Sequence, residues 1–185
     1  MYYNLKYMRF SRAFSIIEMI VVLAIVAALS GVLVVNFRAS SRNASARHQV
    51  ANKILSDIRA MQSRALAGST VESGIVCGFG AHYVNEKTYL LFARPILSGL
   101  WCEDDSRSKT YYSGDDEIID TVMLGNANMI FLSSFSDIYF EIPYSTTYID
   151  GATSSVIEIA PVGEFESSSI TSITVYNSGR IDINN

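Results

Sequence analysis

Proline, cysteine and histidine are scarce in this chain. All three prolines lie beyond residue 94, so no proline would kink a helix in the first half of the sequence. Cys77 and Cys102 are the only cysteines, and they do not form a C-x-x-C pair. With His48 and His82 as the only histidines, the ligand spacing of a zinc site is missing.

Enzyme motifs are missing as well. The chain has no G-x-S-x-G, no P-loop and no H-E-x-x-H, and Gly78-Phe79-Gly80 lacks the later glycine of a dinucleotide site. Serine, histidine and aspartate are present, but a catalytic triad is recognised by geometry and not by composition. We therefore expect a protein that is not an enzyme and has no cofactor, apart from a calcium ion that an acidic loop could hold.

Charge is unevenly distributed along the chain. Residues 1–13 carry a net charge of +3 and residues 38–64 a net charge of +5. Residues 65–185 contain five basic and sixteen acidic side chains, a net charge of −11. The acidic part would repel phosphates, so nucleic acid is not an expected partner. The basic stretch fits either a solvated helix face or the surface of an anionic membrane.

One long apolar segment, residues 14–37, contains Glu18 as its only charge. As a helix these 24 residues would be about 36 Å long, enough to cross a hydrocarbon core of about 30 Å. We expect this segment to span a membrane once. The basic leader would stay in the cytoplasm, which places the C-terminal domain outside.

A cleaved secretory signal and a plain signal anchor are alternatives for this segment. Val26-Ala27-Ala28 loosely resembles a signal-peptidase site, but the apolar run continues past it to Phe37. A plain anchor explains the length of the run. It does not explain Glu18, because a carboxylate costs about 2.5 to 3.5 kcal/mol at the centre of a membrane helix.

The residues around Glu18 form a recognisable pattern. Arg12-Ala13 is followed by Phe14-Ser15-Ile16-Ile17-Glu18-Met19 and then by apolar residues to Ile25 and beyond. A basic leader, a small residue, Phe, and Glu four positions after Phe resemble the class III signal of type IV pilins and type II secretion pseudopilins. The resemblance implies that a prepilin peptidase cleaves between Ala13 and Phe14 and methylates the new amine of Phe14.

The match departs from the family pattern in two respects. Ala13 stands where the family usually has glycine, which implies slower processing, and the apolar helix lacks the proline that many members have. Translation from Met8 instead of Met1 would give a short, basic leader like many in the family. Both starts therefore remain open.

The resemblance also implies a purpose for Glu18. Its carboxylate would pair with the Phe14 amine of a neighbouring subunit and so set the assembly register; the alternative is a Glu18 that only reaches the membrane interface. The implied partners are prepilin peptidase, other pilin or pseudopilin subunits, an inner-membrane assembly platform and membrane lipid. The implied location is the inner membrane and afterwards a cell-surface or periplasmic filament.

Beyond Phe37 the apolar residues keep a helical spacing. Val50, Ile54, Ile58, Met61 and Ala65 recur at intervals of three and four, which predicts one apolar helix face packed on a sheet. The segment 67–69, with glycine in its middle, predicts the end of this helix.

The rest of the sequence alternates short β-branched and aromatic runs with turn residues. We predict strands at 75–79, 89–93, 118–124, 129–132, 137–141, 156–160, 170–176 and 180–183. The last two would form a hairpin through Asn177-Ser178-Gly179. The fold class is therefore α+β, with a long N-terminal helix on an antiparallel sheet. The division is a leader at 1–13, a transmembrane or filament-core helix at 14–37, its amphipathic continuation at 38–67 and a β-rich domain at 68–185.

The order of elements and Gly179-Arg180 in the closing hairpin weakly resemble H-type minor pseudopilins and FimT-like pilins. Some FimT-like proteins bind DNA through Gly-Arg-x-Arg. This chain has Asp182 in place of the second arginine. The substitution argues against DNA binding.

Two further sites are candidates in the β-rich domain. Cys77 and Cys102 form either a disulfide, which would contribute about 3 to 4 kcal/mol in an exported protein, or two reduced thiols. The stretch between Trp101 and Asp120 is either a solvated acidic loop or a calcium site without EF-hand spacing. Its candidate ligands are Asp104, Asp105, Asp115, Asp116 and Glu117.

Together these features predict a structural pilin or minor pseudopilin of a type IV pilus or type II secretion-type filament. The alternative is a membrane-anchored or pilus-tip protein that binds or adheres and uses a pilin-type signal. Pilus, secretion and DNA uptake all remain open, as do the roles of major and minor subunit.

Overall fold

The computed structural model describes residues 15–96, 102, 109–125, 128–163 and 166–184, without the side chains of 33–41. Ala13 and Phe14 thus lie outside the described residues. The chain divides into two compact units, of which the first ends at Arg42 and the second runs from Asn43 to Asn185.

Helix α1 (Ile16–Leu66) starts directly after Ser15. The Ser15 carbonyl accepts the backbone N–H groups of Glu18 at 3.0 Å and Met19 at 3.2 Å, which closes the first turn. Among the described residues, no helix is both long enough and apolar enough to cross a membrane. The span expected over 14–37 includes residues outside that description, and it stays a prediction.

The helix ends where the sequence predicts a stop. Gly68 adopts a positive φ of 60°, which glycine tolerates without strain. The N–H of Gly68 then bonds to the Ala65 carbonyl at 3.2 Å, and that of Ser69 to the Arg64 carbonyl at 3.1 Å. The carbonyls of Arg64 and Ala65, in the last turn of α1, are thereby satisfied.

The described residues after α1 form two antiparallel sheets, with strand orders β3-β2-β1-β5-β6 and β4-β7-β8-β9. The strands are β1 (Val76–Asn85), β2 (Thr88–Pro95), β3 (Glu117–Met123), β4 (Met129–Phe131), β5 (Ile138–Glu141), β6 (Thr146–Ile149), β7 (Ser154–Pro161), β8 (Thr171–Tyr176) and β9 (Ile181–Asn184). A short 3-10 turn, η2 (Ser167–Ser169), precedes β8. The predicted α+β class with antiparallel pairing is confirmed.

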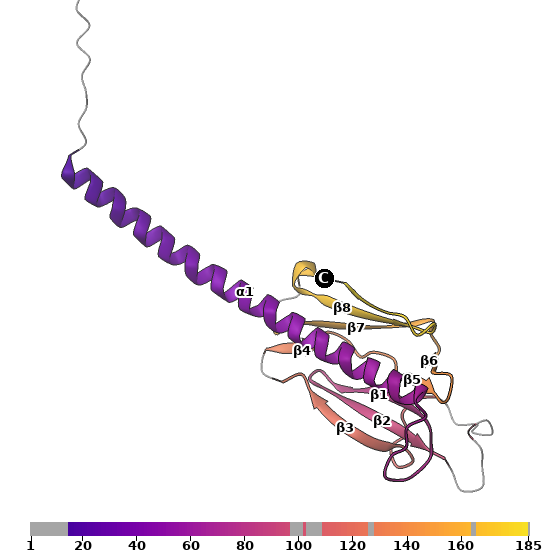
Figure 1. Cartoon of the computed structure of the whole chain (residues 1–185). Coiled ribbons are helices and arrows are strands. Elements are labelled where there is room, and N and C mark those ends of the chain that lie inside the picture. Colours follow the sequence, from indigo (N-terminus) through magenta and orange to yellow (C-terminus); the bar gives the residue numbers. More distant parts are fainter. Residues whose placement is uncertain (1–14, 97–101, 103–108, 126–127, 164–165, 185) are drawn as a thin grey trace, which may run out of the picture. The chain divides into compact units, whose positions relative to one another are not determined.

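The second half of α1 joins the two sheets in one core. Ala51, which the spacing did not predict, is 1% exposed. Of the predicted apolar face, Ile54, Ile58, Met61 and Ala65 are each at most 2% exposed, and Val50 is partly buried against the same cluster. They cluster with Phe79 and Phe140 from one sheet and with Phe131 and Ile173 from the other. In Figure 1 the last turns of α1 lie between the β7–β8 pair and the β1–β3 strands.

The structure corrects the predicted strands in three respects. Strand β6 was not predicted, because its threonines and its closeness to Pro143 are typical of a turn. Strand β1 begins one residue later than predicted and continues six residues further, to Asn85, whose side chain accepts the Lys87 N–H at 2.9 Å and shapes the turn into β2. The strands also divide between two sheets where one was expected, since strand order is not encoded in local spacing.

The predicted closing hairpin is confirmed. Strands β8 and β9 pair in antiparallel fashion, and Gly179 between them has a φ of 79°. Its N–H donates to the Tyr176 carbonyl at 2.8 Å, while its own carbonyl accepts the Gln62 side chain of α1 at 3.1 Å. The hairpin is therefore attached directly to the helix.

Gly80 of β1 leaves room for an aromatic ring from the neighbouring strand. Phe92 of β2 is the cross-strand partner of Gly80. A Cβ on Gly80 would overlap the Phe92 ring and the Ile138 carbonyl oxygen. Because the Ile138 oxygen belongs to the backbone of β5, rotating the Phe92 side chain would not by itself make room for a Cβ at Gly80.

We predict that Gly80→Ala lowers the free energy of unfolding by about 1 to 3 kcal/mol through overpacking. Gly31→Ala is the control, because nothing lies within 4 Å of a Cβ at that helical position. Urea unfolding followed by circular dichroism would measure both variants. Equal stability of Gly80→Ala and the parent would contradict the packing argument.

Candidate functional site

The first part of α1 exposes apolar side chains on all sides. Such a surface is favourable only when lipid or protein covers it, because a helix that is apolar all round is found buried. The large apolar side chains of this surface, each 50 to 81% exposed, are Ile16, Ile17, Met19, Ile20, Val21, Val22, Leu23, Ile25, Val26, Leu29 and Val32. This apolar surface, 16–32, is the first candidate functional site.

Glu18 is the only charged residue of the apolar surface, 16–32. It lies in the first turn of α1, is exposed, and has its carboxylate at the helix end where the backbone dipole favours negative charge. Phe14, its expected partner in a neighbouring subunit, and Ala13 lie outside the described residues. The cleavage, methylation and pairing assigned to these residues stay predictions.

Asp116, one of the five candidate calcium ligands, forms a buried ion pair with Arg94. The Arg94 Nε donates to Asp116 Oδ1 at 2.9 Å and its Nη2 to Oδ2 at 3.0 Å, and both side chains are fully buried. The Tyr112 N–H adds a bond of 2.8 Å to Oδ2. A calcium ion would compete with these donors for the Asp116 carboxylate.

The remaining acidic candidates do not converge in the described part of the chain. Glu117 accepts the backbone N–H of Ser73 at 3.3 Å, whereas Asp104 and Asp105 lie outside the described residues. No group of three or more His, Cys, Asp or Glu side chains among the described residues could hold a metal ion. Calcium binding stays an untested prediction.

Cys77 and Cys102 are joined by a disulfide with a Cα–Cα distance of 5.2 Å. Cys77 is in β1 and is buried, so the bridge attaches the chain around residue 102 to an inner strand of the larger sheet. No free cysteine occurs in the chain as the structure describes it.

A polar chain of three side chains connects α1 to β2. Lys53 Nζ lies 2.5 Å from Asp57 Oδ1, one helical turn away, and the Tyr89 hydroxyl donates to Asp57 Oδ2 at 2.6 Å. Tyr89 is 1% exposed. Burial and, to a lesser extent, the nearby Asp57 carboxylate raise the pKa of the Tyr89 phenol well above its ordinary value.

A second polar cluster holds residues 109–112 against the larger sheet. The Asp137 carboxylate lies 2.7 Å from His82 Nδ1 through Oδ1 and accepts the Tyr111 N–H at 2.7 Å through Oδ2. Lys109 Nζ adds an ion pair of 2.8 Å with Glu141. These contacts hold residues 109–112 on the larger sheet.

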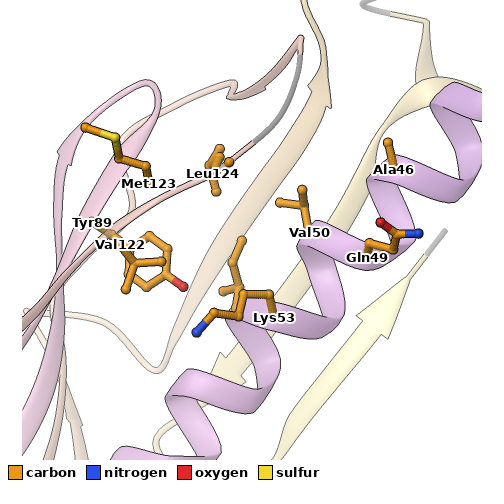
Figure 2. A pocket seen from close by; sticks show the side chains of 10 residues that line it. Ala46, Gln49, Val50, Lys53, Tyr89, Val122, Met123 and Leu124 are labelled. Atoms are coloured by element: carbon orange, nitrogen blue, oxygen red, sulfur yellow. The ribbon is translucent and has the colours of Figure 1, made fainter.

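Next to the Lys53–Asp57–Tyr89 chain lies a cavity of about 300 Å³ between α1 and the end of β3. Figure 2 shows the Lys53 amine and the Tyr89 hydroxyl at one end and the side chains of Val50 and Leu124 further along. The lining residues are Ala46, Gln49, Val50, Lys53, Ile54, Tyr89, Val122, Met123, Leu124 and Gly125. This is the second candidate functional site.

The chain is similar in structure to the type IV minor pilin FimU of Pseudomonas aeruginosa. The similarity covers 80% of this chain and 92% of that chain, at 11% sequence identity and a TM-score of 0.45. At this identity the likeness concerns the fold and says nothing of individual residues. No protein-family model and no curated protein matches the sequence.

Sequence reasoning missed the buried polar pairs and the cavity. The i,i+4 spacing of Lys53 and Asp57 is a local signal that could have been read. Tyr89 and Arg94 gave no such signal, because their partners lie 32 and 22 residues away and are brought together by the fold.

The Tyr89 phenol predicts a pH dependence of stability. Its folded-state pKa lies above the unfolded value of 10.0, so its contribution is complete below that pH and is lost as the pH rises beyond it. Tyr89→Phe should therefore cost about 1 to 3 kcal/mol at pH ~8, from the lost bond to buried Asp57, and less at pH ~11. Urea unfolding at both pH values measures the difference.

Tyr144→Phe is the matched control, because Tyr144 is 84% exposed. Its stability curve should follow that of the parent chain. A Tyr89→Phe deficit that does not shrink at high pH would contradict the assignment of the raised pKa.

Proposed function

We propose that this chain is a structural subunit of a type IV pilus or type II secretion-type filament. The observation that carries the proposal is the apolar surface, 16–32, with Glu18 in its first turn as the only charge. The sequence Arg12-Ala13-Phe14 directly before it supplies the processing pattern.

Burial of the apolar surface, 16–32, drives assembly. Each Å² of apolar surface removed from water contributes about 25 cal/mol, so eleven large side chains that are at least half exposed represent a substantial driving force. Lipid supplies this burial before assembly, and the same helices of other subunits supply it in the filament.

Glu18 selects one register among many equivalent apolar contacts. A carboxylate covered by apolar side chains is costly unless a positive group meets it. A methylated amine at Phe14 of the neighbouring subunit supplies that charge four residues before Glu18. Only the relative shift of two adjacent helices that brings the Phe14 amine of one to the Glu18 carboxylate of the other pairs both charges.

The proposed role also defines how the chain is processed and where it is located. Prepilin peptidase cleaves after Ala13 and methylates Phe14. Before assembly the chain is anchored in the inner membrane with the acidic second unit outside. The assembly platform then transfers it into the filament.

A tip or adhesion role is the second candidate, and the cavity beside Lys53 is the observation that favours it. The stoichiometry in sheared filaments distinguishes the two roles. A major structural subunit dominates the filament, whereas a tip protein is present in a few copies.

The first prediction from this proposal concerns the mature N-terminus. Co-expression with a prepilin peptidase should yield a chain that begins at Phe14 and carries one added methyl group, as measured by intact mass. Ala13→Gly should be processed faster, and Ala13→Leu should block cleavage, because the subsite requires a small residue. A mature N-terminus at any other residue would refute the assignment.

The second prediction concerns Glu18. Glu18→Ala should leave the membrane-bound amount unchanged and reduce incorporation into filaments about tenfold or more, since the neighbour's amine loses its partner. Immunoblots of membranes and sheared filaments measure both quantities. Glu18→Asp should restore part of the incorporation, and Ser30→Ala, a polar change in the same helix, should have no effect. Normal incorporation of the Glu18→Ala variant into filaments would contradict the proposal that Glu18 sets the assembly register.

A further inference from the structure

Strand β3 forms one edge of the larger sheet, whose strand order is β3-β2-β1-β5-β6. Among the described strands it pairs with β2 alone, and in Figure 1 it lies at the outer side of that sheet. With seven residues it is longer than the other described edge strands, β4, β6 and β9, which have three or four. A long edge strand offers its backbone groups to a further strand. This edge is called the β3 edge from here on.

The direction of the backbone groups in β3 shows which of them are available. The Leu124 N–H, directly after the strand, donates to the Lys87 carbonyl at the start of β2 at 2.9 Å. Backbone groups alternate in direction along a strand, so those of Val122 also point toward β2, and those of Thr121 and Met123 point away from it. The side chains of Thr121 and Met123 are exposed as well. Their N–H and carbonyl groups are therefore directed outward, with the spacing that another extended backbone can pair with.

The charges along the β3 edge are mainly negative. Glu117 and Asp120 lie on the strand, and Asp115 lies just before it. Lys87 is near the opposite end, since it lines a cavity together with Met123. The other described charges close to β3 are in neutral ion pairs, Lys53 with Asp57 and Arg94 with Asp116. Three acids thus face one lysine, and the first half of the strand is acidic.

These charges distinguish between possible partners. The same edge of a second copy would bring identical acids next to each other, and like charges across a strand pair are destabilising. No described strand of this chain carries more than one lysine or arginine. A strand from another protein, with basic side chains opposite Glu117 and Asp120, would gain attraction instead. Ile118 and Met123, 49% and 72% exposed, offer apolar contacts to that strand.

We propose that the β3 edge binds an extended segment of another protein, which adds as a further strand and carries basic side chains opposite Glu117 and Asp120. The backbone of Thr121 and Met123 pairs with the backbone of this segment, as in other proteins that bind peptides by strand addition. The partner is thus defined by an extended conformation and by lysine or arginine beside the first half of β3. This binding does not depend on the proposed filament role.

The test uses the full-length chain in phosphatidylcholine nanodiscs and a synthetic peptide as the probe. The peptide, acetyl-Thr-Val-Thr-Lys-Val-Thr-Lys-amide, places its lysines near Glu117 and Asp120 when it pairs antiparallel to β3. We expect saturable binding, measured by fluorescence anisotropy of the labelled peptide. Hydrogen exchange followed by NMR should become slower at the Thr121 and Met123 amides. The Val122 amide, which points toward β2, is the internal reference and should not change.

Two changes to the probe separate the contribution of charge from that of backbone pairing. The peptide with glutamate in place of both lysines should bind at least about tenfold more weakly, because like charges then face each other. N-methylation of the peptide amides that face β3 should abolish binding, since it removes the backbone donors of the added strand. Neither change alters the protein, so neither can act by unfolding it.

Substitutions in the protein test the same two contacts. The double variant Glu117→Gln with Asp120→Asn should weaken binding of the lysine peptide about fivefold. Asp150→Asn is the matched control, because Asp150 is an exposed acid directly after β6, at the opposite edge of the same sheet. Thr121→Pro removes an outward N–H and should weaken binding at least about tenfold. If Thr121→Pro unfolds the domain, the N-methylated peptide tests the same backbone contact.

Three results would overturn the proposal. The first is equal binding of the labelled peptide to empty nanodiscs and to nanodiscs that hold the protein, as expected for uptake by lipid only. The second is equal affinity for the lysine and glutamate peptides, or an affinity that N-methylation leaves unchanged. The third is protection of the Thr121 and Met123 amides that rises with protein concentration in the absence of peptide, since a second copy of the chain would then occupy the β3 edge.

Discussion

The structure depends on a single helix that carries two different apolar surfaces. From Ala51 to Ala65 the apolar residues form a stripe, which the side chains of both sheets cover. Because Phe79 and Ile173 belong to different sheets but to the same core around α1, neither sheet would have this core without the helix. In the apolar surface, 16–32, the large apolar side chains are at least half exposed among the residues that the structure describes. The two parts of the helix therefore differ in how far the described residues bury them.

Polar contacts fix where the helix lies on the sheets, which apolar packing alone does not. Asp57 binds the Tyr89 hydroxyl of β2, and Gln62 binds the Gly179 carbonyl in the β8–β9 turn. These two residues are little more than one turn apart on α1, so they attach one short stretch of helix to both sheets. Hydrogen bonds are directional and a missing partner for a buried polar group is costly, so a shifted helix would lose both contacts.

The sequence predicted what depends on local patterns. The 3.6-residue spacing of Ile54, Ile58 and Met61 predicted the buried face, and Gly68 and Gly179 predicted the end of α1 and the last turn. It did not predict β6, whose threonines carry little apolar signal, or the division into two sheets, which depends on pairing between distant strands. Arg94 and Asp116 illustrate the same limit at a candidate site, since composition indicated Asp116 as a candidate calcium ligand but gave no sign of its buried ion pair with Arg94.

The buried acids that the structure describes in the second unit are paired, and this observation is relevant to Glu18. Asp57 and Asp116 are the two buried acids there among the described residues; Asp57 meets Lys53 and Tyr89, and Asp116 meets Arg94. Glu18 has no ion-pair partner in the described part of the chain, and it lies among the large exposed side chains of the apolar surface, 16–32. Once they are covered, an unpaired carboxylate would cost more than any single apolar contact returns. In the filament proposed above, a positive group fixed at the same depth in an adjacent helix would pair with Glu18 in one relative position only.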